Sequence, residues 1–97
     1  METKFQVSIH PTSAKEDWPF LPKTIQDRIG RNVTAKLATY PQLYGKPLRS
    51  GLKNNWKLRI GDFRVIYSIQ KNKVNIWAIG HRSVIYAIAL KRLLARL

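Results

Sequence analysis

Apolar and polar residues alternate through much of the second half of the chain. An apolar residue at every second position is typical of β-strands, and the pattern predicts strands over 56–60, 63–70 and 74–79. Short polar turns at 61–62 and 71–73 separate these segments. The alternation therefore predicts three antiparallel strands that are joined by tight hairpins.

The two faces of this predicted meander differ in character. One face is predicted to be buried and carries Trp56, Leu58, Phe63, Val65 and Tyr67. The other face collects Lys57, Arg59 and Arg64. In the third strand, Val74, Ile76 and Ala78 are predicted to alternate with Asn75, Trp77 and Ile79. A charged strand face is usually solvated, but two of the three cations are arginine and acidic residues are few, so we interpret this face as an anion-binding surface.

The first half of the chain predicts one strand and two helices. A weaker alternation predicts a strand over 5–10, and Ser13 is a candidate N-cap for a short helix over 13–20. A second helix begins near Pro22 and ends at or before Tyr40, because Pro41 disfavours helical backbone in the residue before it. Its apolar residues recur every four positions: Ile25, Ile29, Val33 and Leu37. Residues 42–55 are predicted to form a loop.

A helix with Ser83 as its candidate N-cap is predicted to end the chain. Its apolar stripe is expected to face the core and comprises Tyr86, Ala87, Leu90, Leu93, Leu94 and Leu97. Three aliphatic residues lie on a different side: Val84, Ile85 and Ile88. These three either join the core or form an exposed patch that binds a partner.

These elements predict an α+β fold in a single domain over residues 1–97. The expected order is a strand, two helices, a three-stranded meander and a C-terminal helix around a small antiparallel sheet. The chain contains no internal repeat and no low-complexity segment.

Composition narrows the classes of function. The net charge is +13, from 18 Lys and Arg residues against five Asp and Glu residues, which favours a polyanionic partner and nucleic acid above all. Cysteine is absent, which excludes disulfides and thiolate metal sites and fits a reducing cytoplasm. The sequence has no signal peptide and no apolar segment long enough to cross a membrane, so no membrane association is expected.

The chain resembles the RelE/ParE superfamily of toxin–antitoxin toxins. The resemblance lies in the order of its elements and in three motifs: Lys57-Leu58-Arg59, Gly61-Asp62-Phe63-Arg64-Val65-Ile66-Tyr67, and Ile79-Gly80-His81-Arg82 with Tyr86 four residues later. It is most similar to the RelE branch, whose members cleave messenger RNA, usually during translation on the ribosome. The implied partners are mRNA, the ribosome and a cognate antitoxin, for which we expect an acidic, partly disordered chain.

The resemblance also implies the site. It implies that Lys57, Arg59, Arg64, Arg82 and Tyr86 hold the scissile phosphate and assist proton transfer. We take Lys57, Arg64, Arg82 and Tyr86 as the candidate catalytic residues. Arg59 is a candidate for binding phosphate or RNA, as are Lys46, Arg49, Lys53 and His81 by their charge or residue type. One position departs from the RelE pattern, since Asn55 stands where a lysine is usual. Lys53 is a candidate replacement for that lysine; the other possibility is reduced activity.

RNA cleavage by its own 2′-hydroxyl requires a base, cations that stabilise the phosphorane, and an acid for the leaving 5′-oxygen. Arg64 and Arg82 suit the second task, because guanidinium binds phosphate oxygens in pairs. Lys57 is either the base or a further electrostatic contact. His81 carries protons by residue type, but strand parity directs it away from Arg82, so it is equally a surface residue. Tyr86 is either a catalytic residue or a core residue.

The acidic residues predict no metal site, because no cluster of them has ligand spacing, and no cofactor is expected. Two alternatives stay open. One is a ParE-like inhibitor of DNA gyrase or topoisomerase that cleaves nothing, and the other is a catalytically weak relative that is kept for regulation.

Overall fold

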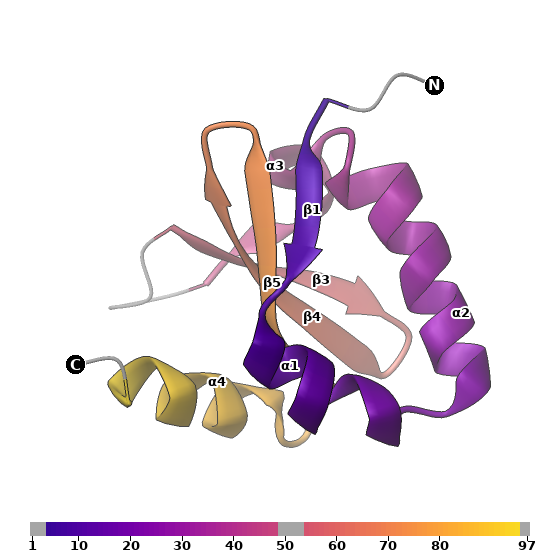
Figure 1. The fold of residues 1–97 in the computed structure, drawn as a ribbon, viewed down its shortest axis with the longest axis vertical. Helices are drawn as coiled ribbons and strands as arrows, with labels where there is room; N and C mark the ends of the chain where they lie inside the picture. The colour runs from indigo at the N-terminus through magenta and orange to yellow at the C-terminus, as the bar shows by residue number, and fades with distance from the viewer. Residues whose placement is uncertain (1–3, 49–53, 96–97) are drawn as a thin grey trace.

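In the computed structural model, which describes residues 4–48 and 54–95, a five-stranded sheet crosses the molecule (Figure 1). The strand order is β1-β5-β4-β3-β2. The strands are β1 (Gln6–Ile9), β2 (Lys46–Pro47), β3 (Asn55–Ile60), β4 (Phe63–Gln70) and β5 (Lys73–His81). The predicted meander of β3, β4 and β5 is antiparallel, as expected, whereas β1 pairs with β5 in parallel, so the sheet is mixed.

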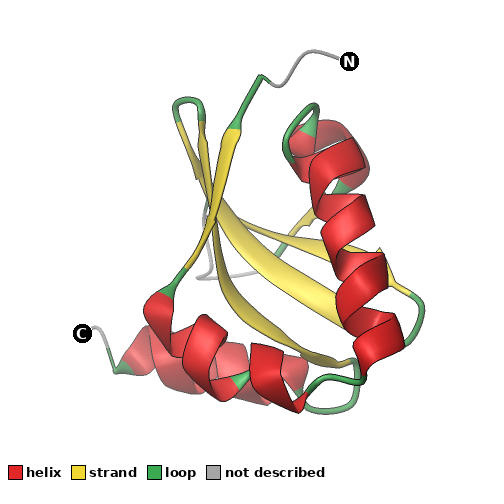
Figure 2. Cartoon of the chain, turned by 45° about the vertical axis from the view of Figure 1, so that its right-hand side comes forward, coloured by secondary structure: helices red, strands yellow, loops and turns green. Residues whose placement is uncertain are grey.

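The helices gather on the two faces and at one end of the sheet (Figure 2). They are α1 (Pro11–Glu16), the 3₁₀ turn η1 (Trp18–Phe20), α2 (Lys23–Asn32), the π-helical turn η2 (Val33–Leu37), α3 (Pro41–Tyr44) and α4 (Ile85–Leu94). Figure 1 shows α2 along one side of the sheet, with α1 and α4 next to each other at the end where β1 and β5 reach them. This α+β architecture with a C-terminal helix confirms the predicted fold class.

The larger core lies between α2 and one face of the sheet. Its buried residues include Leu58, Val65 and Tyr67 from the meander, together with Ile29 and Leu37 from α2 and η2. Partly buried neighbours pack against them: Phe5, Val7, Trp18, Leu21, Ile25, Val33, Trp56 and Ile69. The predicted four-residue spacing from position 25 to position 37 is therefore confirmed as the buried face of this helix.

A smaller core lies on the opposite face of the sheet, beneath α4. It consists of Ile66, Trp77, Ala78, Ile85 and Ala89. Two of these residues, Trp77 and Ala78, are consecutive in β5, which simple alternation does not allow.

The cause is a β-bulge between β4 and β5. Ile66 is opposite Ala78, but Tyr67 is opposite Ile76, so Trp77 is an extra residue in β5. Beyond the bulge the alternation changes phase, and Ile79 joins the larger core. The predicted grouping of Ala78 with Val74 and Ile76 is therefore wrong.

The orientation of α4 also differs from the prediction. The stripe that was expected in the core is largely exposed, since Tyr86, Leu90 and Leu94 retain 43%, 50% and 57% of their accessible surface. Ile85 and Ala89 face the sheet instead. The reason is the small space above Gly80: Ile85 packs there, and a Cβ on Gly80 would touch its side chain.

Three element boundaries differ as well. His10 caps α1 by accepting a hydrogen bond from the Thr12 amide, while Ser13 is buried and donates to Asp17. The predicted loop over 42–55 contains α3 and β2, which are too short to show periodicity in sequence. The last helix begins at Ile85 without a side-chain cap, so the predicted cap at Ser83 is wrong.

Candidate functional site

The registers of β2, β3 and β4 place cations directly opposite one another. Lys46 of β2 faces Lys57 of β3, and Arg59 of β3 faces Arg64 of β4. Like charges directly opposite in an antiparallel pair destabilise a sheet. Two such pairs side by side indicate that folding stability did not select these residues.

These four cations line one small pocket together with two tyrosines. The pocket has a volume of about 230 Å³ and is formed by Tyr44, Lys46, Lys57, Arg59, Arg64 and Tyr86. Tyr86 reaches it from the first turn of α4, and its ring centroid is 5.5 Å from Lys57 Nζ. The sequence motifs thus converge from three strands and a helix on one point of the surface.

Little negative charge balances this pocket. Among residues 4–48 and 54–95, ion pairs join Lys23 to Asp27, Arg82 to Asp62 and Arg92 to Asp17, and none involves a pocket cation. A phosphate group would supply the missing countercharge and would accept hydrogen bonds from each of the four side chains.

Arg64 is the most restrained of these cations. Its Nη1 donates to the carbonyl oxygens of Gly61 and Phe63, both at 2.9 Å. The β3–β4 turn therefore holds one end of the guanidinium, and the side chain is preorganised at the pocket.

Arg82 lies beside the same turn but does not line the pocket. Its amide donates to the carbonyl of Asp62, and its Nε is 3.7 Å from the Asp62 carboxylate. Both side chains are more than half exposed, so this ion pair is weak.

His81 lies on the other face of the sheet. It is opposite Phe63 in the β4–β5 ladder, and the two rings meet edge to face. Its Nδ1 accepts a hydrogen bond from the Ser83 amide. The proton of the neutral ring is therefore on Nε2. The geometry gives His81 a local role in the turn before α4 and leaves its predicted role in RNA binding unsupported.

Asn55, at the position where RelE proteins usually have lysine, has a structural contact. Its side-chain oxygen accepts a hydrogen bond from the indole of Trp77 at 3.0 Å. The side-chain amide of Asn55 thus provides a hydrogen-bond acceptor for the indole N–H of a buried ring in the smaller core.

Of the other predicted binding residues, Arg49 and Lys53 lie outside the described residues. Within the predicted partner patch, Ile85 is fully buried and belongs to the core, Ile88 is half-buried, and Val84 is 48% exposed. In this conformation α4 directs Ile85 into the sheet, which is the core placement that the sequence left open. Partner binding by Val84 and Ile88 stays a prediction.

Tyr44 is a pocket residue that the sequence pattern did not predict. It stands inside the segment predicted to be a loop, and its only sequence signal is an aromatic residue two positions before Lys46. Only the pairing of β2 with β3 brings it next to Lys57.

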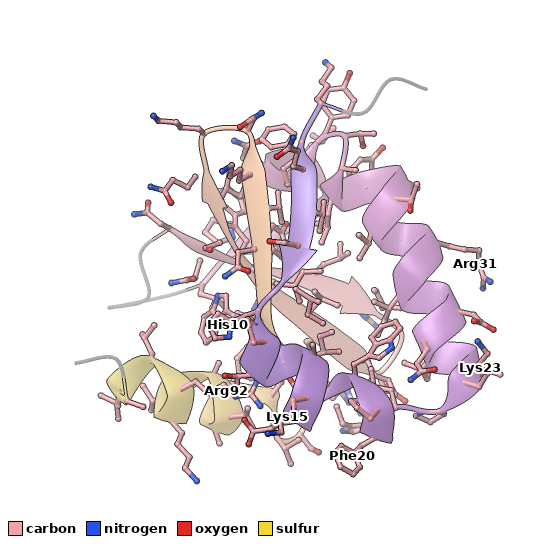
Figure 3. All side chains as sticks on the ribbon, in the orientation of Figure 1. His10, Lys15, Phe20, Lys23, Arg31 and Arg92 are labelled. Carbon is pink, nitrogen blue, oxygen red and sulfur yellow. The ribbon has the colours of Figure 1, made fainter. Side chains whose placement is uncertain are left out.

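A second polar cluster lies between α1 and α4, and its opposite charges pair with each other. Arg92 donates to both carboxylate oxygens of Asp17, at 2.7 and 2.8 Å, and to the carbonyl of Trp77. The hydrogen bonds to Asp17 raise the pKa of Arg92. Asp17 also accepts from Ser13 and from the Ile79 amide. Figure 3 shows Arg92 extending from α4 toward α1.

Comparison with known proteins identifies the family. The family model described as the ParE toxin of type II toxin-antitoxin system, parDE, matches residues 9–86. The chain belongs to this toxin family. It is also 36% identical over 84 residues to Toxin RelE of Mycobacterium tuberculosis, across 84% of this chain and 86% of the relative. The resemblance to the RelE/ParE superfamily is thereby confirmed.

Solved structures of RelE toxins have the same fold. The toxin–antitoxin complex RelBE2 of Mycobacterium tuberculosis has a TM-score of 0.74 at 28% identity, with 84% of this chain and 95% of the other covered. The RelB–RelE complex of Methanococcus jannaschii has a TM-score of 0.65 at 20% identity, with 82% and 95% covered. The isolated E. coli RelE toxin has a TM-score of 0.66 at 23% identity, with 92% and 98% covered.

The described part of the chain has neither a metal-binding cluster nor a membrane-spanning helix. Residues 4–48 and 54–95 contain no group of three or more His, Cys, Asp or Glu side chains that could hold a metal ion. None of the helices found there has the length and apolar character needed to cross a membrane.

Proposed function

We propose that this toxin is an endoribonuclease that cleaves mRNA, on the ribosome, and so inhibits translation. The observation that carries the proposal is the pocket itself, where Lys57, Arg59, Arg64 and Tyr86 meet without a paired carboxylate among the described residues. The relatedness to Toxin RelE supports the same function. A ParE-like inhibitor of DNA gyrase is not favoured, because the curated relative and the similar complexes are RelE proteins.

The chemistry follows from the charge of the pocket. Four cations repel a divalent metal ion, so the nucleophile that we propose is the 2′-hydroxyl of the RNA. Its oxygen forms a bond to phosphorus, and the bond from phosphorus to the 5′-oxygen breaks. The fragments then carry a 2′,3′-cyclic phosphate and a 5′-hydroxyl.

Each residue has a proposed task. Arg64, held by the turn, stabilises the charge that develops on the phosphorane, with Arg59 and Lys46 beside it. Lys57 takes the 2′ proton if its amine is uncharged; if it is the ammonium counted among the four cations, it neutralises the phosphate and the 2′ proton passes to water. The Tyr86 hydroxyl donates a proton to the leaving 5′-oxygen. Arg82 retains its proposed catalytic role only if it leaves its weak contact with Asp62 and turns into the pocket.

We also propose a cognate antitoxin as the partner that restrains this activity. The solved relatives include toxin–antitoxin complexes with RelB. A chain of net charge +13 favours an acidic partner.

The first prediction concerns the ends of the cleaved RNA. Induction of the protein should arrest growth and produce new transcript ends that carry 5′-hydroxyl groups. On purified ribosomes, replacement of the 2′-hydroxyl by hydrogen at the cut nucleotide should abolish cleavage, because the nucleophile is then missing. The same mRNA with the replacement three nucleotides away is the matched control and should be cut normally. Fragments with 5′-phosphates would contradict the mechanism.

A further inference from the structure

Tyrosine rings form two sides of the cationic pocket. Tyr86 comes from α4, and Tyr44 comes from the end of α3 on the other side. Both rings are about half exposed, at 43% and 46%. The proposed mechanism uses Tyr86 and gives Tyr44 no task.

The side chain of Tyr44 makes few contacts with the described part of the protein. Its one aromatic contact among the described residues is with Lys36, whose Nζ lies 5.7 Å from the ring centroid, near the outer limit of a cation–π contact. Within the same part of the chain, no hydrogen bond involves its hydroxyl. A large ring that is left half exposed beside four cations is available to a ligand.

The backbone under Tyr44 is fixed. The buried hydroxyl of Tyr67 donates to the carbonyl of Pro41 at 2.6 Å, and burial raises the pKa of Tyr67, so this donor keeps its proton. Gly45 lies directly against the same hydroxyl, where any side chain would overlap it. On the other side, Lys46 pairs with Lys57. The ring is therefore attached to a rigid support, as a preorganised binding residue requires.

Aromatic rings beside cations are the usual way in which proteins hold single-stranded nucleic acid. The cations bind the phosphates, and unpaired bases stack on the rings whatever their identity. Because Tyr44 borders the pocket that would hold the reacting phosphate, a base attached to that nucleotide or to its neighbour lies within reach of the ring.

We propose that Tyr44 is a base-stacking residue that positions an unpaired nucleobase of the RNA next to the scissile phosphate. This inference rests on the proposed function and specifies its substrate as single-stranded RNA. Stacking of this kind is present before and during the reaction, so it lowers KM and leaves kcat nearly unchanged.

The experiment compares Tyr44→Leu with Tyr44→Phe, since both lose the hydroxyl and only the first loses the ring. The probe is a short single-stranded RNA, 2′-deoxy at the cut position, with 2-aminopurine at successive positions. Wild type and Tyr44→Phe should quench 2-aminopurine at one position near the cut, and Tyr44→Leu should lose that quenching and bind at least about fivefold more weakly. On ribosomes, Tyr44→Leu should raise KM with kcat within about twofold.

Tyr40→Leu is the matched control. Tyr40 is 44% exposed, directly precedes α3 and contacts Lys4, but it does not line the pocket. The Tyr40→Leu variant should quench 2-aminopurine and cleave RNA like wild type. Thermal unfolding of each variant checks that it is folded.

Two results overturn the inference: quenching and KM for Tyr44→Leu that equal those of wild type, or equal losses for Tyr44→Leu and Tyr44→Phe. Failure of the proposed function looks different, because wild type itself would then cleave no RNA, while the quenching comparison could still be made.

Discussion

Arg64 combines a free charge with a fixed position. Two turn carbonyls hold its Nη1, and its strand partner is another arginine. A lysine at this position would keep the charge but lose both the planar fork and the contacts to the turn. Substitution of Arg64 by lysine therefore distinguishes simple attraction of polyanions from stabilisation of a transition state.

We expect Arg64→Lys to reduce kcat by more than about tenfold while RNA affinity changes less. Single-turnover cleavage and equilibrium binding measure the two quantities. Arg31→Lys is the matched control, because Arg31 points outward from α2 in Figure 3, and it should change neither. If Arg64→Lys cleaves at the wild-type rate, the site assignment is wrong.

At the scale of elements, α4 is attached to the rest of the fold through a small number of buried side chains. Only Ile85 and Ala89 of α4 are buried, and Arg92 fastens its last turn to Asp17. The side chains of this ion pair are 18% and 4% exposed, so removal of one partner leaves a buried charge unpaired. Because α4 also carries Tyr86, its attachment sets one side of the pocket.

Arg92→Met should therefore lower the free energy of unfolding by about 3 kcal/mol. Denaturant unfolding measures this change. The control is Lys23→Met, which removes the exposed pair with Asp27 and should change stability by less than about 0.5 kcal/mol. Equal effects of the two variants would show that the contact between α4 and α1 is not a buried ion pair in solution.

At the scale of the whole molecule, positive charge dominates. A net charge of +13 attracts RNA in many orientations, and the pocket provides the place where phosphate contacts are specific. Salt dependence can distinguish the two contributions, because each specific phosphate contact releases a counterion.

For binding to a single-stranded RNA, the slope of log K against log salt concentration should become shallower by about 0.7 in Lys46→Ala. Lys15→Ala removes an equal charge from α1, outside the pocket, and serves as the control. Its slope should stay near that of wild type. Equal slopes for the two variants would mean that Lys46 acts only through net charge.

Local sequence was enough to predict the strands of the meander, the buried face of α2 and the cations of β3 and β4, because strict periodicity and local turn residues fix these features. The motif around Arg64 identified the superfamily for the same reason, since all of its residues lie close together in sequence.

The other features depend on how distant segments pack together. The bulge at Trp77 placed Ala78 and Ile79 each on the face opposite to the one that alternation predicts. A single extra residue of this kind leaves no mark on an apolar segment. The exposed stripe of α4 and the inward position of Ile85 depended on the space above Gly80. Tyr44 joined the site only because two residues of β2 pair with β3, a contact between segments that local sequence does not encode.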